Sequence, residues 1–494
     1  MSVAAMRADA LLDGLADAGA AAAVAVRGLQ LDSRRVQPGE AFVALRGTQH
    51  HGIDFAAQAL AAGAALVLAE TPAPQAAPQL PQVIWVDDLG AQLGSIAARF
   101  YGDPSRALRV IGVTGTNGKT SSVQLLTQAL ELLGRRAASI GTLGAGLHGQ
   151  LDAGARTTPD AISVQRLLRE FSDAGASDVA MEVSSHALQQ GRVNAVRFAV
   201  AAFTNLTRDH LDYHGSMQAY GAAKARLFAW PGLRAAVLNI DDAFGARLAA
   251  TMAPDVRVLR VSAAGDAHAE LRAEAIVSSP EGIGFTLHTP WGSGALRSAL
   301  LGRINVENLL LVAACLGVLE FPFARVLHVL QQLEPIRGRM NRLGGMGAQP
   351  LVVIDYAHTP DALQQALRAL RAHCAGHLWC VFGCGGERDA GKRPQMGALA
   401  ADLADRVLLT DDNPRGEDGD AIVAAIRAGM PVSATVVIER DRARAIALAL
   451  REAHAGDVVL IAGKGHETYQ ESGGKAWPFD DLAVARAALE ARPC

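Results

Sequence analysis

The chain of 494 residues is half apolar and carries a formal net charge of only −3. That length allows about three domains with separate cores, and the small charge provides no global field favouring nucleic acid or a membrane surface. The N-terminus has no basic region leading into an apolar core, and no stretch approaches roughly 18 consecutive apolar residues. Five cysteines, an odd number, do not suggest a disulfide framework. We therefore expect a cytoplasmic protein without nucleic-acid or membrane partners.

The first segment, residues 1–106, contains short apolar runs separated by helical patterns. We predict strands at 41–45, 65–69 and 83–86. Four prolines interrupt residues 71–82, which predicts a surface loop there. The sequence Tyr-Gly-Asp-Pro-Ser at 101–105 is the predicted linker to the next segment.

The second and third segments, residues 107–338 and 339–494, alternate predicted strands with helical patterns, including a helix at 361–372. This alternation predicts parallel sheets with helices on both faces and ligands bound beyond the carboxyl ends of the strands. The predicted strands are 109–113, 178–183, 198–203 and 235–240 in the second segment, and 351–355, 377–383, 406–410, 434–438 and 457–462 in the third.

A glycine-rich loop, Val-Thr-Gly-Thr-Asn-Gly-Lys-Thr at 113–120, follows a predicted strand and opens a predicted helix. This context favours a phosphate-binding loop, since backbone N–H groups and the helix N-terminus attract phosphate. Lys119 would reach the β- and γ-phosphates, and the Thr120 hydroxyl would ligate Mg²⁺. Val113 stands where the general pattern has glycine, and the alternative is an ordinary glycine-rich turn.

Carboxylate, amide and imidazole groups gather at two further predicted strand ends. Glu182 ends one strand, and Asn205, Asp209, His210 and Asp212 follow another. Such groups beside a phosphate loop suit a divalent cation, although solvated strand ends are the alternative. Lys224, taken alone, has the pattern of a surface lysine.

Three cysteines, Cys374, Cys380 and Cys384, lie close together in the third segment. Their spacing matches no zinc pattern. Cys380 and Cys384 lie on or just after an apolar strand, which favours buried thiols over a metal site. Asp-Asn-Pro-Arg at 412–415 follows the next predicted strand, and its alternatives are an Asx-Pro turn and a ligand loop.

Eight motifs together resemble the Mur ligase family, and most closely its branch that adds meso-diaminopimelate. They span all three segments. The variant Thr-Gly-Thr-Asn-Gly-Lys-Thr is itself the form found in Mur ligases and folylpolyglutamate synthases. The motifs are Leu31–Arg34, Thr114–Thr120, Met181–His186, Thr204–His214, Asp355–Asp361, Gly383–Asp389, Asp412–Arg415 and Ala462–Glu467.

The resemblance implies a three-domain α/β fold: a UDP-binding α/β domain at 1–106, a central ATP-binding domain with a phosphate loop and parallel sheet at 107–338, and a Rossmann-like amino-acid-binding domain at 339–494. It implies an ATP-dependent ligase that adds meso-diaminopimelate to UDP-N-acetylmuramoyl-L-alanyl-D-glutamate through an acyl phosphate, in peptidoglycan precursor synthesis. The resemblance also implies ATP as co-substrate and two Mg²⁺ ions as cofactors. The implied oligomeric state is a monomer.

The resemblance also implies a role for individual residues. The implied catalytic residues are Lys119, Glu182, His210, Lys224 and Arg339. The implied ATP contacts are Gly115, Thr116, Asn117, Gly118, Lys119, Thr120, Ser121, Asn305 and Asp355. The implied contacts to the UDP-linked substrate are Leu31, Ser33, Thr48, Gln49, His50, Thr157, Thr158, Ser184, Gln190 and Arg192. The implied metal ligands are Thr120, Glu182, His210 and Lys224 as a carbamate. The implied diaminopimelate contacts are Arg388, Asp412, Asn413, Pro414, Arg415, Gly463 and Glu467.

Charge favours diaminopimelate over lysine as the added amino acid. The planar guanidinium of Arg415 matches the second carboxylate of diaminopimelate, which lysine lacks, and Glu467 could hold the distal ammonium. Two residues depart from the family pattern: Arg156 stands where a related enzyme has asparagine, and Ser121 replaces a common threonine.

Other functions are open on the motifs alone. A lysine-adding or folate-polyglutamating ligase shares the fold, but Leu31–Arg34 and a complete first segment argue against the folate enzyme. A phosphotransferase or plain ATPase would explain the phosphate loop but not the Arg415 loop. A non-catalytic scaffold would have lost catalytic groups, yet Lys119, Glu182, His210 and Lys224 are all present.

Overall fold

The computed structural model describes residues 4–47, 50–75, 77–78, 80–154 and 156–492. Thr48 and Gln49, expected near uracil, lie outside these residues. The chain forms two compact units, Met1–Leu259 and Arg260–Cys494. The predicted α/β class with parallel sheets is confirmed in both units.

The first sheet of unit 1 contains four parallel strands in the order β3-β4-β5-β6. Its strands are β3 (Leu29–Gln30), β4 (Ala41–Ala44), β5 (Leu66–Glu70) and β6 (Val83–Val86). Alternate residues of β4 enter two different cores, so both faces of the sheet are covered. Helices α1 (Ala8–Leu12), α2 (Ala56–Ala61) and α3 (Leu89–Phe100) and the short pair β1 (Met6–Arg7) and β2 (Ala25–Val26) complete this part.

The predicted loop and the predicted linker of this region differ in their structure. The described residues of 71–82 form no helix or strand, as predicted. The predicted linker is instead packed: Tyr101 belongs to the core beneath the first sheet, and Pro104–Arg106 form a 3₁₀ turn. An aromatic ring buried at a segment boundary fixes the chain there, which composition alone did not indicate.

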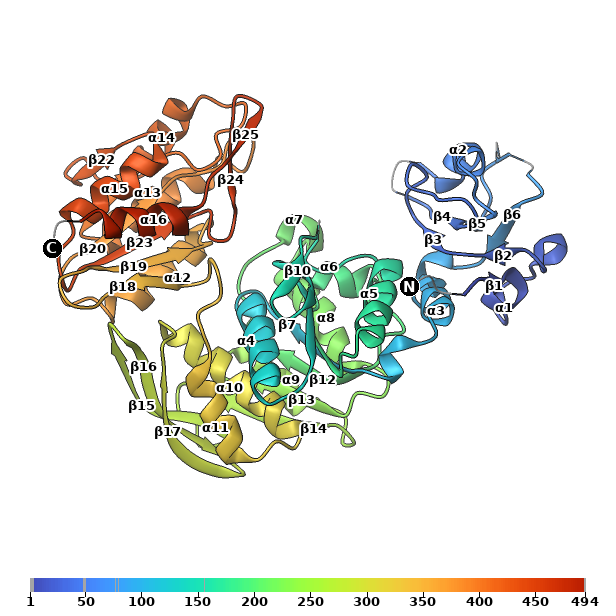
Figure 1. Ribbon diagram of the computed structural model, residues 1–494, viewed down its shortest axis with the longest axis horizontal. Coiled ribbons are helices and arrows are strands. Elements are labelled where there is room, and N and C mark those ends of the chain that lie inside the picture. Colours follow the sequence, from blue (N-terminus) through green and yellow to red (C-terminus); the bar gives the residue numbers. More distant parts are fainter. Residues whose placement is uncertain (1–3, 48–49, 76, 79, 155, 493–494) are drawn as a thin grey trace. The chain divides into compact units, whose positions relative to one another are not determined.

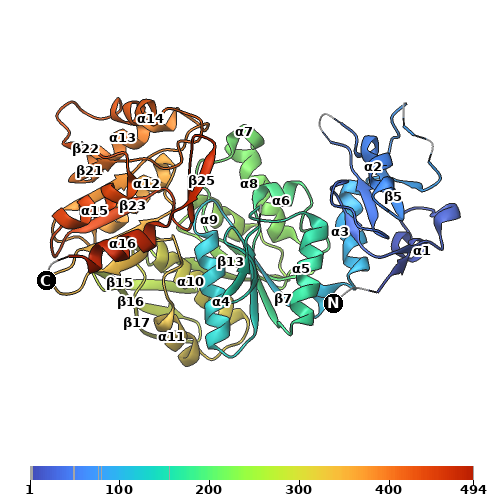
Figure 2. The ribbon, with the colours of Figure 1, turned by 45° about the horizontal axis from the view of Figure 1, so that its top comes forward.

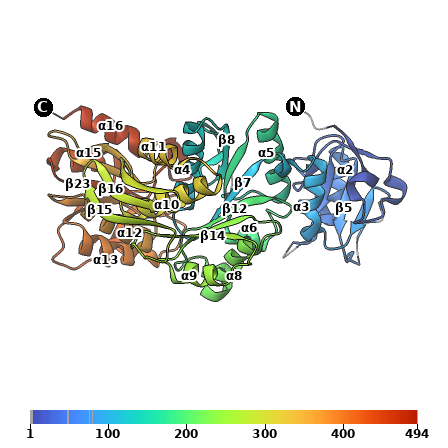
Figure 3. The same ribbon diagram turned by 90° about the horizontal axis from the view of Figure 1, so that it is seen from below.

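The second sheet of unit 1 has the order β10-β9-β8-β11-β7-β12-β13. The five adjacent strands β8, β11, β7, β12 and β13 are parallel. Its strands are β7 (Arg109–Thr114), β8 (Ala137–Gly141), β9 (Gly144–Leu147), β10 (Gln150–Asp152), β11 (Asp178–Glu182), β12 (Phe198–Phe203) and β13 (Ala235–Asn239). Its helices are α4 (Lys119–Leu132), α5 (Ala161–Asp173), α6 (Ser185–Gln189), α7 (Leu211–His214), α8 (Met217–Ala225) and α9 (Ala243–Ala250). Helices α5 and α9 pack on one face of the parallel strands, with Leu168 and Phe244 in one core, whereas α4 lies on the other face, where Gln124 Nε2 donates to Ser139 Oγ (Figure 3).

Unit 2 begins with an antiparallel ladder that the sequence did not predict. Strands β15 (Leu271–Ser279), β16 (Gly282–Thr289) and β17 (Gly292–Ser298) pair in order, and the end of β14 (Arg257–Ser262) joins β15 through Val261 and Ser262. Helices α10 (Arg303–Val318) and α11 (Phe323–Gln332) pack against this ladder.

The main sheet of unit 2 has the order β18-β19-β23-β20-β21-β22, parallel except at the edge strand β18. Helices α12 to α14 cover one face and α15 and α16 the other (Figures 1 and 2). The strands are β18 (Asn341–Gly344), β19 (Leu351–Asp355), β20 (Leu378–Phe382), β21 (Arg406–Leu409), β22 (Val436–Ile438) and β23 (Val458–Ala462), followed by a hairpin of β24 (Tyr469–Ser472) and β25 (Lys475–Pro478). The helices are α12 (Pro360–Arg371), α13 (Lys392–Leu403), α14 (Gly419–Arg427), α15 (Arg442–Glu452) and α16 (Asp481–Glu490).

Two exclusions made from the sequence can be compared with the structure. Cys380 and Cys384 are buried beside β20, and burial raises the pKa of both thiols, as expected for packed cysteines. Over the part of the chain that the structure describes, no helix combines the length and the apolar character needed to cross a bilayer.

Candidate functional site

The glycine-rich loop joins β7 to α4 in a backbone conformation that requires glycine. Gly115 and Gly118 have φ angles of 146° and 83°. A Cβ atom added at Gly115 would lie 1.8 Å from Thr204 Oγ1. The turn therefore packs tightly on the segment after β12, and its backbone N–H groups precede the positive end of a helix, as a phosphate site requires.

Two lysines converge on this loop. Lys119 Nζ donates to the carbonyl oxygens of Gly115 and Thr116 at 2.9 and 2.7 Å, and Lys224 Nζ donates to the same Gly115 oxygen at 2.6 Å. Lys224 is 1% exposed, so its interpretation as a surface lysine is wrong. Burial and the Lys119 charge hold the pKa of Lys224 well below its usual value, which favours a neutral amine.

Glu182 faces the start of α4. Its Oε2 accepts a 3.0 Å hydrogen bond from Thr120 Oγ1, and its Oε1 accepts one of 2.8 Å from the backbone N–H of Thr142. The carboxylate is 1% exposed. A buried carboxylate beside a hydroxyl and a phosphate loop is an oxygen donor set that fits a hard divalent cation such as Mg²⁺.

The segment after β12 lies along the phosphate loop. Asn205 accepts hydrogen bonds from the backbone N–H groups of Thr116 and Asn117, at 2.8 and 2.9 Å. His210 has a left-handed backbone, with φ of 51°. Its ring lies 6.1 Å from the Tyr220 ring, whose face also lies 4.4 Å from Lys224 Nζ. Tyr220 thus places His210 and Lys224 in one neighbourhood.

The other acidic side chains predicted here lie less deeply. Asp209 is exposed and approaches His210 Nε2 at 3.4 Å, and Asp212 is exposed on α7. Among the residues that the structure describes, no three His, Cys, Asp or Glu side chains form a ready metal cage. A cation at this site would therefore draw on separate groups such as Thr120, Glu182 and His210 rather than on a cluster of acidic residues.

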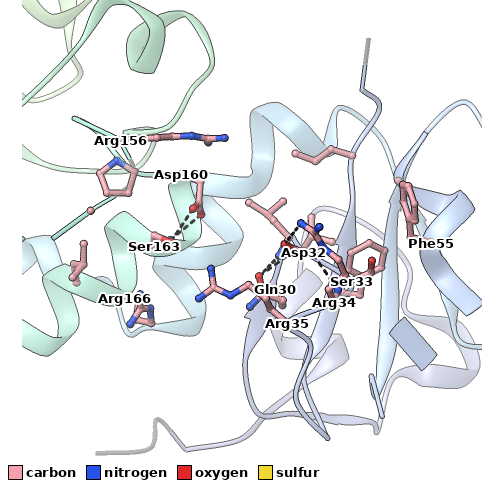
Figure 4. A pocket seen from close by; sticks show the side chains of 18 of the residues that line it. Gln30, Asp32, Ser33, Arg34, Arg35, Phe55, Arg156, Asp160, Ser163 and Arg166 are labelled. Atoms are coloured by element: carbon pink, nitrogen blue, oxygen red, sulfur yellow. Dashed lines mark hydrogen bonds and ion pairs between the residues drawn. The ribbon is translucent and has the colours of Figure 1, made fainter. Parts of the chain in front are cut away.

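A cavity of about 1020 Å³ lies between the first sheet of unit 1 and the region around α5 (Figure 4). Leu31, Ser33 and His50 line it, as do four arginines. Ser33 is buried and donates to Gln58 Oε1 at 2.9 Å. The four arginines are Arg34, Arg35, Arg156 and Arg166. Their positive charge suits a ligand with phosphate groups.

The residues expected to hold the peptide end form a hydrogen-bonded chain that reaches Glu182. Thr158 Oγ1 donates to the Glu182 carbonyl at 2.8 Å, and Arg192 donates to the Thr158 carbonyl at 2.9 Å. Gln190 Oε1 accepts from Arg192 at 2.6 Å, and Ser184 caps α6. Thr157 contacts Thr142 at 3.1 Å between the two hydroxyl oxygens.

The residues expected to hold the added amino acid meet in unit 2, where three loops and the β24–β25 hairpin come together. Arg415 has φ of 55° and donates from Nη1 to the Gly386 carbonyl at 2.7 Å. Its Nε lies 3.3 Å from Glu471 Oε2 on the hairpin. A Cβ at Gly385 would touch both Arg415 and Arg388, so these cations flank that glycine.

The other side chains of this cluster are largely buried. Asn413 Nδ2 donates to Glu467 Oε2 at 3.0 Å. Gly463, with φ of 116°, lies against Asp412, since a Cβ there would be 2.4 Å from Asp412 Oδ2. Burial raises the pKa of the Asp412 carboxyl group. Pro414 is buried between Asn413 and Arg415, in the loop that follows β21 along the chain.

Three residues expected to act on ATP lie elsewhere in unit 2. The Arg339 guanidinium lies 4.8 Å from the centre of the Tyr356 ring, and Asp355 accepts from the Met340 N–H at 2.7 Å. Burial raises the pKa of Asp355 and Arg339 opposes that rise. Asn305 is buried within α10, donating to the Leu301 carbonyl and accepting from Asn308. Its amide is already bonded at both ends, so the adenine contact stays a prediction.

Family comparisons match this architecture. The model of the Mur ligase family catalytic domain matches residues 25–101, that of the Mur ligase middle domain residues 113–316, and that of the Mur ligase glutamate ligase domain residues 338–465. A UDP-N-acetylmuramoyl-L-alanyl-D-glutamate--2,6-diaminopimelate ligase of Xanthomonas campestris pv. campestris (strain 8004) is 56% identical over 98% of each chain. The chain belongs to the Mur ligase family.

Two further relatives of this Mur ligase carry the same name. The protein from Pseudomonas aeruginosa is 53% identical over 94% of this chain and 95% of the relative. A solved structure of a UDP-N-acetylmuramoyl-L-alanyl-D-glutamate--2,6-diaminopimelate ligase is 36% identical, with a TM-score of 0.75 over 99% of both chains.

Sequence reasoning missed several residues that shape the site of this Mur ligase. The backbone N–H of Thr142 donates to Glu182, and the Tyr220 ring lies near both His210 and Lys224. Glu471 forms an ion pair with Arg415. Lys464 lies within the family motif Ala462–Glu467, but the sequence predicted no role for it. Thr142, Tyr220 and Glu471 lie outside the eight family motifs, and only the folded chain brings them to the site.

Proposed function

We propose that this Mur ligase uses ATP to join meso-diaminopimelate to the terminal glutamate of UDP-N-acetylmuramoyl-L-alanyl-D-glutamate, as a cytoplasmic step of peptidoglycan precursor synthesis. The observation that carries the proposal is the convergence of Arg415 and Glu467 on one loop cluster. A guanidinium and a carboxylate complement the two charges at the distal end of diaminopimelate. Lysine has no second carboxylate to offer Arg415. The names of the relatives support the same substrate.

The first half-reaction activates a carboxylate. The glutamate carboxylate attacks the γ-phosphorus of ATP, the bond to ADP breaks, and an acyl phosphate forms. Both partners are anionic, so Lys119 and Arg339 would offset their repulsion and stabilise the charge that develops during transfer. Gly115 to Thr120 would hold the phosphates through backbone N–H groups.

Magnesium would supply further positive charge at the transferred phosphoryl group. Thr120 and Glu182 would hold one ion, and Glu182, His210 and Lys224 a second. The lowered pKa of Lys224 favours the neutral amine, which is not a ligand that Mg²⁺ prefers. Attack of this amine on CO₂ forms an N–C bond and releases a proton, which leaves a carbamate with two oxygen donors.

The second half-reaction forms the amide. An unprotonated amine of diaminopimelate attacks the acyl carbon, and phosphate leaves from the tetrahedral intermediate. Arg388, Arg415 and Glu467 would orient the amino acid, with Asp412, Asn413, Pro414 and Gly463 shaping its pocket. Exclusion of water protects the acyl phosphate from hydrolysis.

The cavity of unit 1 would hold the UDP end of the substrate. Leu31, Ser33 and His50 line it, and Arg34, Arg35, Arg156 and Arg166 provide charge for the diphosphate. Arg156 replaces the asparagine of a related enzyme, so we propose that this chain adds a charged contact there. From this cavity, Thr157, Thr158, Ser184, Gln190 and Arg192 would lead the peptide towards Glu182.

The proposal is tested by product analysis. The enzyme is incubated with UDP-muramoyl-dipeptide, ATP, Mg²⁺ and isotope-labelled meso-diaminopimelate, and the products are separated and weighed by mass spectrometry. We expect a UDP-muramoyl-tripeptide that carries the label, together with ADP and phosphate. ADP formation without a labelled product would instead favour an ATPase, and transfer of phosphate to a stable product would favour a phosphotransferase.

A further inference from the structure

Lys464 is a fully buried lysine between β23 and the β24–β25 hairpin. Its side chain has no exposed surface. The ammonium donates to Asn413 Oδ1 at 2.9 Å and to Glu467 Oε2 at 3.3 Å. Asn413 Nδ2 donates to the same Glu467 oxygen at 3.0 Å. A cation, an amide and a carboxylate therefore form a closed triangle.

This triangle determines which way the Asn413 amide points. Its Oδ1 also accepts a 2.9 Å hydrogen bond from the backbone N–H of Glu471. An ammonium group and a backbone N–H can only donate, so the atom they share must be the amide oxygen. The amide nitrogen must then face Glu467. Lys464 is the charged donor to Asn413 Oδ1, and the backbone N–H of Glu471 in the hairpin is the neutral donor.

The position of the ammonium is unfavourable for a lysine that serves packing alone. Burial disfavours a charged amine and lowers the pKa of Lys464, whereas the neighbouring Asp412 and Glu467 carboxylates favour the charged form. A buried ion pair commonly adds little stability compared with apolar side chains of similar volume. The buried ammonium of Lys464 therefore indicates a role in orienting the Asn413 and Glu467 side chains.

We propose that Lys464 is a positioning residue for diaminopimelate: it fixes the Asn413 amide and the Glu467 carboxylate in the orientation that receives the distal end of the amino acid. The inference rests on the proposed function, which places both side chains in the diaminopimelate pocket. Because Lys464 has no exposed surface, it acts through these two side chains and does not touch the substrate itself.

The test compares Lys464→Met with the wild-type enzyme in steady-state kinetics with each substrate varied in turn. Loss of an orienting partner commonly costs about 10- to 100-fold in ligand affinity, so we expect a rise of that size in the KM for diaminopimelate. The KM values for ATP and for the UDP-linked substrate should not change. Lys475→Met, which removes an exposed lysine from β25, is the matched control and should leave all three KM values unchanged.

A double-mutant cycle separates positioning from packing. If Lys464 acts through Glu467, then Lys464→Met combined with Glu467→Gln should be no worse towards diaminopimelate than Glu467→Gln alone. The double variant also removes both charges of the Lys464–Glu467 pair, so it should fold even if Lys464→Met does not. The same cycle is made with Asn413→Ala. Multiplication of the single effects in both cycles would overturn the proposal, because Lys464 would then act independently of Glu467 and of Asn413.

The outcomes distinguish this inference from the proposed function. A wild-type enzyme that forms no product with diaminopimelate contradicts the proposed function, whatever Lys464 does. A wild-type enzyme that uses diaminopimelate, together with a Lys464→Met variant of lower melting temperature and unchanged KM for diaminopimelate, contradicts the inference alone. In that case Lys464 serves stability only.

Discussion

Lys224 shows how burial changes the chemistry of a side chain. Its pattern on α8 resembles that of many exposed lysines, yet the folded chain buries it against Gly115 and Tyr220. Sequence reasoning from the residues alone could not find this, because burial depends on packing between α8 and a loop more than 100 residues earlier. Only the family resemblance selected the residue.

The proposed mechanism converts the Lys224 amine to a carbamate, and we therefore predict that activity depends on dissolved CO₂. Enzyme in degassed buffer should lose activity and recover it when bicarbonate is added. The lowered pKa keeps the amine neutral above that pKa, so the requirement for bicarbonate should increase as pH falls through it. A carbamate signal in ¹³C NMR after addition of labelled bicarbonate provides a direct readout.

The Lys224→Met variant is the control for this prediction. It should have little activity at any bicarbonate concentration and should lack the carbamate signal. Full activity of the wild-type enzyme without CO₂, or of Lys224→Met, would show that the carbamate is not needed.

In the proposed function, the preference for diaminopimelate depends on Arg415. Removal of a guanidinium that pairs with a ligand carboxylate typically costs about 2–5 kcal/mol, so Arg415→Met should lower kcat/KM for diaminopimelate by roughly 30-fold or more. Turnover with lysine, which has no second carboxylate, should change little. Arg415→Lys keeps the charge but loses the planar fork and should have an intermediate effect. Unchanged selectivity in Arg415→Met would assign the preference to other residues.

At the scale of elements, hydrophobic runs predicted the parallel strands well. The predicted strands at 198–203, 351–355 and 83–86 match β12, β19 and β6 in both bounds. These strands are covered on both faces, or nearly so, and their sequences are nearly continuous apolar runs. The helix predicted at 361–372 forms α12 (Pro360–Arg371), one residue earlier.

The missed elements have different sequences. Strands β15 to β17 face solvent along much of their length and contain Gly282, Gly284, Gly292 and Gly294, which weaken both periodicity and strand propensity. The β24–β25 hairpin has four exposed residues in β25. These strands form by pairing with a neighbouring strand and not by burial of an apolar run. A local sequence pattern cannot predict such pairing.

The N-cap of α9 links an element to the site. Asp242 Oδ1 accepts from Phe244 N and Gly245 N, and Oδ2 accepts from the N–H of Leu206, beside Asn205. Asp242→Ala should lower the free energy of unfolding by about 1–3 kcal/mol, since it removes a cap and a buried hydrogen bond. It should also weaken nucleotide binding, because the loop that supports Thr116 and Asn117 loses its attachment.

The matched control for Asp242→Ala is Asp441→Ala. Asp441 caps α15 by accepting from Arg444 N and holds no loop of the site. We expect a loss of about 1 kcal/mol from denaturant unfolding, with nucleotide affinity unchanged in calorimetry. Equal effects of the two variants on nucleotide binding would remove the proposed link between α9 and the phosphate loop.

At the scale of the whole molecule, each unit carries a separate group of the predicted site residues. The phosphate loop, Glu182, Lys224 and the UDP cavity belong to unit 1, and the Arg415 cluster belongs to unit 2. The three predicted segments, with limits at 106 and 338, stay a prediction about domains. The motifs predicted which residues gather within each unit because each motif lies at a strand end, where a parallel sheet presents its loops.

Unit 2 contains a buried ion pair whose arginine also donates to the Asp411 carbonyl, just before the Arg415 loop. Arg442 and Asp481 pair at 2.7 Å with no exposed side-chain surface, and Arg442 also donates to the Ala462 carbonyl at 3.0 Å. Arg442→Met leaves the Asp481 charge without a partner, which should cost about 3–5 kcal/mol. Adding Asp481→Asn should restore much of the loss in thermal unfolding. A stable Arg442→Met variant would contradict this account of unit 2.

The central claim is that one enzyme couples ATP cleavage to amide formation with diaminopimelate. The most direct measurement is phosphate release from ATP in the presence of UDP-muramoyl-dipeptide, with meso-diaminopimelate, with L-lysine, or with no amino acid. We predict strong release with diaminopimelate and little in the other two reactions. Equal release with lysine would contradict the selectivity assigned to Arg415, and equal release without any amino acid would contradict the ligase itself.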